Sequence, residues 1–297
     1  MIRVGLVDFD TSHVAAFTQR LNHIGVGSEE WVEGATVVAG FPGDSDMMPE
    51  RIPGYVEQLT GYGVPLVESA DDLLGRIDAV MITSQQGARH RERARPFLEA
   101  GLPTFIDKPF AGNVRDAEAI IALAHAHKAP LMSCSALRWA PEVQGALQRR
   151  DEYGKILSVD VWTTAMLHAG NPGLLQYSIH GVEILYTLMG VGCESVQAVF
   201  TPGGEVVTGL WDDGRIATVR GIRDGAGGFG LTAHYEKGHH AATVQSGGYY
   251  REMLRQIVGM FETRQEPIPT AEMREAIAFC DAAAESIARN GASVALR

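Results

Sequence analysis

The alternation of strand-like and helix-like segments over residues 1–134 is the feature that most constrains the fold of this chain. Runs that are apolar at almost every position recur there: IRVGLV, ATVVAGF, IDAVMIT, LPTFI and APLMSC. Such runs predict strands covered on both faces, and strands that alternate with helices favour a parallel sheet. The intervening RHRERARPFLEAG and VRDAEAIIALAHAHK have apolar residues at helical spacing, with stop signals at Gly101 and Lys128. We therefore expect a doubly wound α/β domain over residues 1–134.

A different pattern begins after residue 134. Longer β-type runs follow one another there, with turns such as DDG and GAGG between them: KILSVDVWTTAML, ESVQAVFT, EVVTGLW, RIATVRGI, GFGLTAHY and HAATVQS. Consecutive strands with tight connections predict a mostly antiparallel, open sheet. A helix is expected near SIHGVEILYTLMG, and two more close the chain. Residues 135–297 are thus predicted to form an α+β domain for substrate binding and oligomerisation, whose last helices pack on it or back on the first domain.

Charge and composition exclude several classes of protein. The formal net charge is −11, whereas nucleic-acid and anionic-membrane binders need a clustered basic surface. No run approaches the roughly 18 apolar residues of a membrane span, and the first residues lack the features of a secretory signal. The three cysteines, Cys134, Cys193 and Cys280, form neither a disulfide framework nor a zinc pattern. A reducing, cytoplasmic location is expected.

The loop after the first strand is the first candidate for ligand binding, because ligands of doubly wound sheets lie beyond the carboxyl ends of the strands. A dinucleotide-binding chain would carry G-x-G-x-x-G there, but these positions hold Asp8, Asp10 and His13. The turn glycines are absent, and a carboxylate near a pyrophosphate is repulsive. Asp10, Thr11 and Ser12 can either cap the next helix or offer its start to an anion. The predicted cofactor-binding stretch is Asp8, Phe9, Asp10, Thr11, Ser12 and His13.

The loop after the second strand, GFPGDSD, places Asp44 and Asp46 where an acidic side chain can bind an adenine ribose hydroxyl. A polar loop with a Pro-Gly turn explains either aspartate equally well. This position favours NAD, with NADP as the alternative.

The segments after the third and fourth strands, TSQQGARH and DKPF, are more specific. The spacing VMITSQQGARHRERARPFLEAGLPTFIDKPFA resembles the Gfo/Idh/MocA oxidoreductase family, which has a T-P-N-like turn, a histidine, a helix ending in E-A-G, and E-K-P. The resemblance extends to an Arg-Trp-x-Pro element, the SIHGVEILYTLMG helix and the final helices. It implies a Rossmann domain that binds NAD, and it adds Thr83, Ser84, Gln85, His90, Asp107 and Lys108 to the cofactor-binding residues.

Lys108 is the first predicted catalytic residue. It precedes a proline just beyond a strand, so its side chain can point into a cleft and donate to a substrate hydroxyl or carbonyl. A lysine at a strand end is otherwise a solvated charge. The resemblance assigns this lysine to nicotinamide positioning and substrate contact.

His180 is the second predicted catalytic residue. The segment GLLQYSIHGVEIL resembles the family's G-x-L-x-D-x-G-x-H-x-x-D, with His180 at the histidine and Glu183 at the trailing acid. Gln176 replaces the expected aspartate and cannot take a proton; at four-residue spacing it should share a helix face with His180. A lone helical histidine is otherwise packed or solvent-facing. The predicted substrate-binding residues are Arg138, Trp139, Gln176 and Tyr177, for which helix start and core filling are the alternatives.

Histidines at positions 168, 239 and 240 lack the spacing of a metal site, and no metal is predicted. The sequence therefore predicts an NAD(P)-dependent oxidoreductase that transfers hydride to or from a secondary alcohol of a sugar, inositol-like or related polyol substrate. Two alternatives are a redox-neutral, NAD-assisted glycoside lyase or hydrolase, and a ligand-binding protein that has lost cofactor chemistry. The resemblance implies a homodimer or homotetramer.

Overall fold

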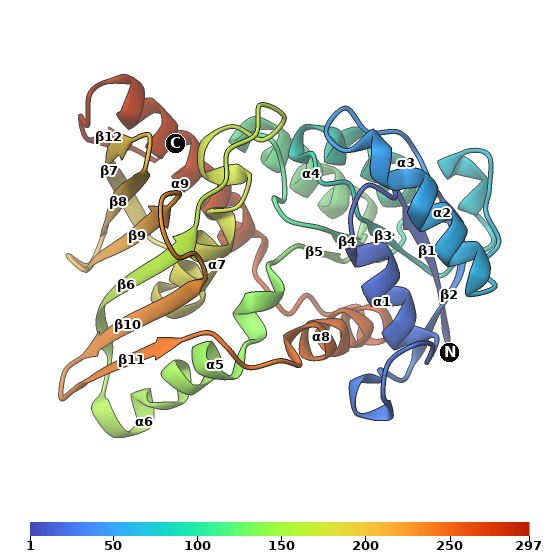
Figure 1. Cartoon of the computed structure of the whole chain (residues 1–297), viewed down its shortest axis with the longest axis horizontal. Coiled ribbons are helices and arrows are strands. Elements are labelled where there is room, and N and C mark those ends of the chain that lie inside the picture. The colour runs from blue at the N-terminus through green and yellow to red at the C-terminus, as the bar shows by residue number, and fades with distance from the viewer. Residues whose placement is uncertain (297) are drawn as a thin grey trace. The chain divides into compact units, whose positions relative to one another are not determined.

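The computed structural model describes residues 1–296, which fold into two compact units. The first unit consists of Met1–Cys134 and Tyr250–Thr270, and the second of Ser135–Tyr249 and the residues from Ala271 onward. Figure 1 shows both units with their helices and strands labelled.

The first unit contains a five-stranded sheet with the order β2-β1-β3-β4-β5, in which every pair is parallel. Its strands are β1 (Ile2–Val7), β2 (Ala35–Phe41), β3 (Ala79–Ile82), β4 (Thr104–Ile106) and β5 (Leu131–Met132). Strands β3, β4 and β5 are buried at every position, as expected for strands covered on both faces. The predicted doubly wound sheet is thus confirmed, and its strand order reverses between β1 and β3.

Helices α1 (His13–Leu21), α2 (Ile52–Gly61), α3 (His90–Glu99) and α4 (Val114–His127) connect these strands, with the short turns η1 (Ser28–Glu30), η2 (Pro49–Arg51), η3 (Ala70–Leu73) and η4 (Gly87–Arg89). Helix α8 (Tyr249–Thr263) comes much later in the chain, and its residues from Tyr250 onward belong to the same unit. The expected stop signals lie where α3 and α4 end: Gly101 and Lys128 both have positive φ, at 70° and 54°.

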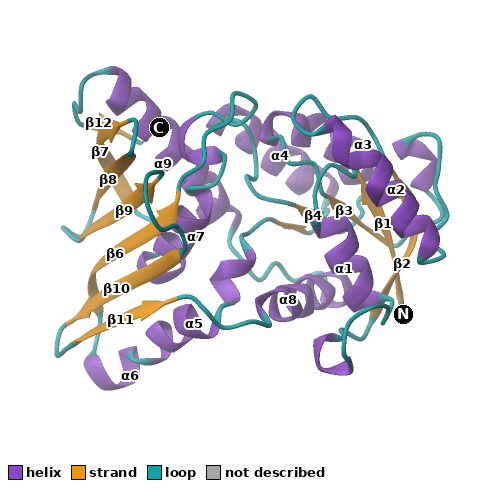
Figure 2. Cartoon of the chain, viewed as in Figure 1, coloured by secondary structure: helices purple, strands orange, loops and turns teal. Residues whose placement is uncertain are grey.

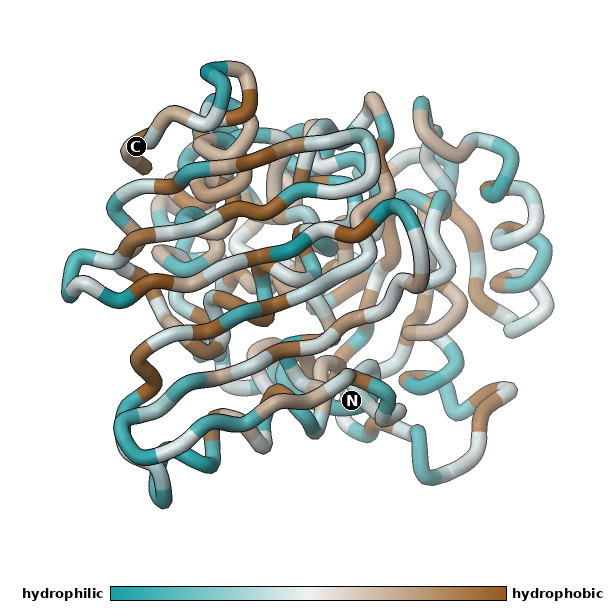
Figure 3. Tube along the Cα trace, turned by 60° about the vertical axis from the view of Figure 1, so that its left-hand side comes forward, coloured by the Kyte–Doolittle hydropathy of each residue, from teal (hydrophilic) through white to brown (hydrophobic). Residues whose placement is uncertain are grey.

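The second unit contains a seven-stranded sheet with the order β11-β10-β6-β9-β8-β7-β12 (Figure 2). The pair β6 and β9 is parallel and the other pairs are antiparallel. The strands are β6 (Ile156–Thr164), β7 (Cys193–Thr201), β8 (Gly204–Trp211), β9 (Ile216–Ile222), β10 (Phe229–Tyr235), β11 (His239–Thr243) and β12 (Val294–Ala295). Apolar and polar positions alternate along them (Figure 3), so one face is buried and the other exposed.

The buried face of this sheet is covered by helices. The elements of the second unit are α5 (Pro141–Gln148), α6 (Arg150–Tyr153), α7 (Ile179–Met189) and α9 (Thr270–Ala288), with the turns η5 (Ala136–Trp139) and η6 (Gly173–Leu175). Helix α7 packs on β6 and β9 through Gly181, where an added Cβ would lie 2.8 Å from the Thr163 side chain. Ser286 of α9 accepts a hydrogen bond from the Ala198 amide of β7 at 2.9 Å. The close approach at Gly181 fixes the position of the neighbouring His180.

Within residues 1–296, no helix has both the length and the apolar character that crossing a membrane requires.

Replacing Gly181 with alanine should lower the free energy of unfolding by about 1 to 2 kcal/mol, because the new methyl group meets Thr163 and Val219 in a packed layer. Gly259→Ala in α8 is the matched control, since no atom lies within 4 Å of its added Cβ. That control should stabilise the protein by about 0.5 to 1 kcal/mol through helix propensity alone. Urea unfolding of both variants measures the difference, and two equal shifts would contradict the close packing of α7.

Candidate active-site residues

Asp8 stands at the first glycine position of the expected dinucleotide loop and adopts a glycine-like backbone, with φ at 65°. Its side chain is fully buried. The carboxylate accepts hydrogen bonds from the Ser84 hydroxyl and from Arg93 Nε, the latter at 2.9 Å. Burial raises the pKa of Asp8, while Ser84 and Arg93 oppose that rise. The charge expected to repel a pyrophosphate is therefore paired with a guanidinium.

Asp10 occupies the second glycine position and is also buried. Its carboxylate accepts from the Ser45 hydroxyl at 2.7 Å and from the Gln85 amide at 3.0 Å. Thr83 donates to the carbonyl oxygens of Val7 and Asp8 at 3.0 and 2.6 Å. The loops after β1, β2 and β3 are thus joined by hydrogen bonds at the strand-order reversal.

The start of α1 is the part of this loop that could bind an anion. Ser12 is the N-cap residue, yet its side chain makes no capping hydrogen bond and is exposed. Thr11 accepts from the His13 amide at 3.3 Å. Ser12 thus does not cap the helix through its side chain, and the other amides of the first turn, together with the helix dipole, suit a phosphate. The Asp8 carboxylate is paired with Arg93 and the Asp10 carboxylate is hydrogen-bonded, so the donors at this helix start fit a pyrophosphate.

His13 fills the third glycine position and faces the end of β4. Its Nδ1 contacts the Asp107 carboxylate, and its Nε2 lies 3.1 Å from the Tyr250 hydroxyl. The ring also stacks on Phe17 at a centroid distance of 4.9 Å. The other Asp107 oxygen accepts from the Lys108 amide at 2.7 Å, so both oxygens of this carboxylate are engaged.

Lys108 follows β4 directly, and its peptide bond with Pro109 is cis. The side chain is half-buried. Burial lowers the pKa of Lys108, while the charges of Asp107 and Asp10 favour the ammonium and oppose that shift. An amine with a lowered pKa is suited to exchanging a proton at neutral pH.

Asp44 and Asp46 are exposed and form ion pairs with two arginines that the sequence analysis did not select. Arg89 lies 2.9 Å from Asp44 and 2.8 Å from Asp46, and Arg93 contacts Asp44 as well as Asp8. Ion pairs with exposed carboxylates are weak, so these side chains can bind a ribose hydroxyl or a phosphate instead of each other. Arg89 and Arg93 are four residues apart at the start of α3, which places them on one helix face. This spacing in the sequence could have identified them.

Phe9 and His90, also predicted at the cofactor, are fully buried. The two ring nitrogens of His90 lie 2.8 Å from the Ser84 carbonyl oxygen and 3.2 Å from that of Phe110. Phe9 packs against Gly40 of β2. Both side chains support the loops, and direct contact with a cofactor remains a prediction.

His180 lies at the start of α7, and its Nδ1 is 2.6 Å from the Ser135 hydroxyl. Tyr177 and Phe229 flank the ring, at centroid distances of 5.0 and 5.6 Å. Burial raises the pKa of Tyr177, and nearby Tyr249 adds to that rise. The Nδ1 atom of the imidazole therefore contacts a hydroxyl.

Gln176 does not share a helix face with His180, which corrects the sequence-based expectation. Helix α7 begins at Ile179, whereas Gln176 follows the turn η6 and bonds Asn171 at 3.3 Å. The turn η6 begins at Gly173, which has a φ of 61°, and is separate from α7.

Arg138 forms a buried cluster with two glutamates. Its guanidinium lies 3.4 Å from Glu183 of α7 and also contacts Glu272 of α9. Burial and the charge of Glu272 raise the pKa of Glu183 to about 7, with Arg138 opposing them. Next to it, Trp139 Nε1 is buried without a hydrogen-bond partner, as a donor awaiting a ligand would be. Substrate contact by Arg138 and Trp139 remains a prediction.

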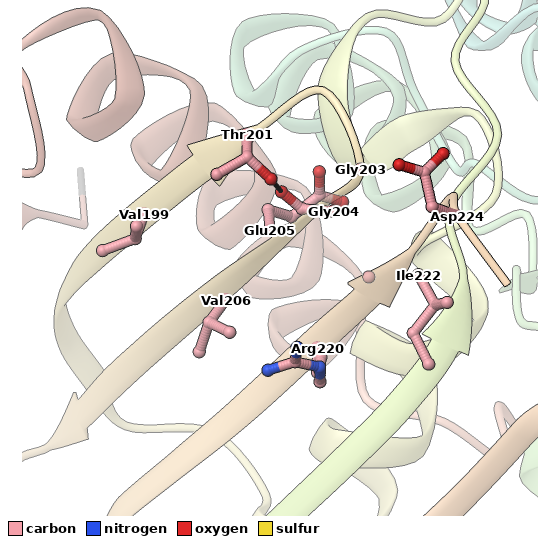
Figure 4. A pocket seen from close by; sticks show the side chains of 10 residues that line it. Val199, Thr201, Gly203, Gly204, Glu205, Val206, Arg220, Ile222 and Asp224 are labelled. Carbon is pink, nitrogen blue, oxygen red and sulfur yellow. Dashed lines mark hydrogen bonds between the residues drawn. The ribbon is translucent and has the colours of Figure 1, made fainter.

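Residues 1–296 hold no cluster of three or more His, Cys, Asp or Glu side chains that could bind a metal ion. A separate hollow of about 370 Å³ lies over β7, β8 and β9 (Figure 4). Val199, Val206 and Arg220 form one cross-strand row of its lining. It contains none of the predicted site residues.

Part of the first unit resembles a known protein family. Residues 54–134 match the family model GFO_IDH_MocA, described as an oxidoreductase family with an NAD-binding Rossmann fold. This segment of the chain is similar to the Gfo/Idh/MocA family. The match begins at residue 54, so the loop from Asp8 to His13 lies outside the matched segment.

One relative is "Putative oxidoreductase YceM" of Salmonella typhimurium, 32% identical over 127 residues. That match spans 42% of this chain and only 41% of YceM. Among solved structures, GenD2 from gentamicin A biosynthesis in complex with NAD has a TM-score of 0.82 at 18% identity, covering 100% of this chain and 96% of its own. Myo-inositol dehydrogenase from Lactobacillus casei, with NAD(H) and myo-inositol, has a TM-score of 0.79 at 16% identity, covering 100% and 97%. At these identities the two structures establish a shared fold.

The structure thus gathers the predicted residues into two sets. Asp8, Asp10, His13, Asp107 and Lys108 lie at the carboxyl ends of the parallel strands in the first unit. In the second unit, Tyr177 and His180 lie beside one another at the start of α7. Sequence reasoning missed their partners Arg93, Ser135, Tyr250 and Glu272.

Arg93→Met should lower the free energy of unfolding by about 3 kcal/mol at pH 8, because it leaves the buried Asp8 carboxylate without its cation. Removing the guanidinium raises the pKa of Asp8 further, so the loss should shrink as the pH falls and Asp8 takes up a proton. Asp8→Asn combined with Arg93→Met should recover most of the loss. The exposed Arg91→Met is the control and should change stability by less than about 0.5 kcal/mol. No recovery in the double variant would contradict the pairing.

Glu183→Gln should change the pH dependence of stability. The folded-state pKa of Glu183 is raised to about 7, so its ionisation opposes folding as the pH rises from its unfolded value of about 4.3. The variant should gain on the parent by about 3 to 4 kcal/mol across that window. Chemical unfolding between pH 4 and 8 measures this, with the exposed Glu285→Gln as control. Parallel stability curves for parent and Glu183→Gln would contradict the shift.

Proposed function

We propose that this protein is an NAD-dependent oxidoreductase that transfers hydride to or from a secondary alcohol of a sugar, inositol-like or related polyol substrate. The observation that carries the proposal is Lys108, which directly follows a buried parallel strand in the segment that matches an NAD-binding family. The lowered pKa of its ammonium supports a role in exchanging the hydroxyl proton.

The residues proposed to hold the dinucleotide lie at the carboxyl ends of the parallel strands. The start of α1, with Thr11 and Ser12, suits the pyrophosphate, and Asp44 with Arg89 suits the adenine ribose. Asp44 favours NAD; the adjacent arginines keep NADP as the alternative, because an arginine can accommodate a 2′-phosphate. When bound, the nicotinamide accepts or delivers the hydride.

The second unit is proposed to bind the substrate. His180, Tyr177 and Trp139 offer ring surfaces and hydrogen-bond donors, which suit a hydroxyl-rich molecule. The myo-inositol and NAD(H) bound by the Lactobacillus casei enzyme support a polyol as the substrate class.

A second candidate function is a ligand-binding protein without redox activity. The hydrogen bonds of Asp10 to Ser45 and Gln85, and of His13 to Asp107, favour it, because they join the strand-end loops across the position of a dinucleotide. A redox-neutral lyase or hydrolase would require transient use of NAD and would yield product without accumulated NADH.

A homodimer or homotetramer is also proposed. Leu157, Val199, Leu210 and Ile216 are exposed on strands of the large sheet, at 42 to 69% of their maximal area, which supports an association surface. The three cysteines are free and buried, which supports a reducing, cytoplasmic location.

Lys108→Met should reduce NAD-dependent turnover of a responsive polyol by about 10² to 10⁴-fold, because the proton-exchanging amine is lost. NADH absorbance with a panel containing myo-inositol and related polyols and aldoses measures turnover. Lys237→Met, at an exposed position between β10 and β11, is the matched control and should leave turnover unchanged.

Calorimetric titration of the unsubstituted protein with NAD and NADP separates the candidates. Dinucleotide binding together with loss of turnover in Lys108→Met is the expected result. Unchanged turnover would refute the role of Lys108, and binding of neither dinucleotide would favour the ligand-binding protein.

A further inference from the structure

Lys108 is a half-buried cation with no direct partner in the first unit. Among the described residues of that unit, no carboxylate forms an ion pair with its ammonium and no oxygen accepts a hydrogen bond from it. The charges of Asp107 and Asp10 nevertheless act on it. A buried charge normally pairs with a neighbour of opposite sign, because burying it alone is costly. Other groups must therefore hold these two carboxylates.

The Asp10 carboxylate is held by the two neighbouring loops. One oxygen accepts from the Ser45 hydroxyl at 2.7 Å, and the other accepts from the Gln85 amide at 3.0 Å. Burial raises the pKa of Asp10, whereas these hydrogen bonds and the charge of His90 oppose that rise. Both oxygens of Asp10 thus have a donor that comes from the loop after β2 or the loop after β3.

The Asp107 carboxylate is held by His13. Burial would raise the pKa of Asp107, but His13 and then Lys108 keep it below its usual value, so the carboxylate is ionised and only accepts hydrogen bonds. The His13 Nδ1 atom that contacts Oδ2 therefore carries a proton and donates it. The Oδ1 atom accepts from the Lys108 backbone amide at 2.7 Å. One imidazole thus occupies the carboxylate oxygen that the backbone leaves open.

The imidazole ring of His13 is itself fixed in place. Its Nε2 lies 3.1 Å from the Tyr250 hydroxyl, and the ring stacks on Phe17 at a centroid distance of 4.9 Å. The guanidinium of Arg20 lies over the Tyr250 ring, 5.4 Å from its centroid, and adds a positive charge on this side. Turning the ring away from Asp107 would break the contacts of both nitrogens and the stacking.

We propose that His13 is a positioning residue for Lys108: its Nδ1–H holds the Asp107 carboxylate away from the Lys108 ammonium and leaves that ammonium free for a ligand. The inference rests on the proposed function only in treating this ligand as the substrate hydroxyl. A free amine can take up and return a proton, whereas an ammonium in a direct ion pair is held in its charged form. The alternative is a structural contact that joins α1 to the end of β4 without effect on the lysine.

Trace acetylation of the full-length protein tests the proposal without cofactor or substrate. Acetic anhydride reacts with deprotonated amines, so peptide mass spectrometry between pH 6 and 10 reports how each lysine titrates. The chain has four lysines, and the other three are exposed and serve as internal references: Lys128, Lys155 and Lys237. In the parent protein, Lys108 should become reactive at a lower pH than the references. A higher pH would overturn the proposal and requires no variant.

His13→Gln is the variant that removes the restraint, because its longer side chain places the amide nitrogen near the position of Nε2 and not of Nδ1. Asp107 should then pair with Lys108, and labelling of Lys108 at pH 8 should fall by about tenfold or more. His13→Asn places its amide nitrogen near the position of Nδ1 and should retain the parent profile. The double variant His13→Gln with Asp107→Asn should be labelled at least as fast as the parent.

The matched control is His23→Gln, just beyond the other end of α1, where the histidine ring stacks on Trp31. It should leave the labelling of Lys108 unchanged, and thermal unfolding reports whether each variant is folded. Unchanged labelling in folded His13→Gln would overturn the proposal. Equal losses in His13→Gln and His13→Asn would also overturn it, because they would trace the effect to the charge of the imidazole. If labelling changes as expected while Lys108→Met retains full turnover, His13 positions the lysine but the proposed function of Lys108 is wrong.

Discussion

The buried carboxylate of Asp8 is the constraint on which the carboxyl-terminal edge of the first sheet depends. It lies beneath the loop after β1 and is bonded to Ser84 after β3 and to Arg93 on α3. A charge at this depth is tolerable only with a cation and hydrogen-bond donors around it. The ion pair thereby fixes the distance between the two loops that flank the strand-order reversal, where ligands of doubly wound sheets bind.

The sequence was sufficient to predict the two sheets, because apolar periodicity reports burial directly. Each strand of both units overlaps a predicted run, apart from the two-residue β12; β7, β8 and β11 begin one residue before their runs. The direction of the Asp8 side chain was beyond such reasoning, because its partner Arg93 is 85 residues away in the sequence. A local motif could show that the glycines were missing but not that a distant arginine compensates for the charge.

The second unit illustrates the same limit. His180 was selected from its motif, but its partner Ser135 lies 45 residues earlier, in a turn whose sequence gives no catalytic signal. The helical spacing of Gln176 was misleading because α7 begins only at Ile179, after the separate turn η6. Periodicity predicted the helix correctly but not its first residue, since helix ends are the least regular part of a periodic pattern.

Lys108 and His180 have different surroundings. Lys108 lies near the carboxylates of Asp107 and Asp10, which favour its ammonium against the effect of burial. The contacts of the His180 ring include the Ser135 hydroxyl and the rings of Tyr177 and Phe229. A carboxylate stabilises a cation, whereas a hydroxyl carries no charge and can donate to an imidazole nitrogen or accept from it. The carboxylates near Lys108 therefore act on its charge, whereas the Ser135 hydroxyl orients the His180 ring without fixing a charge on it.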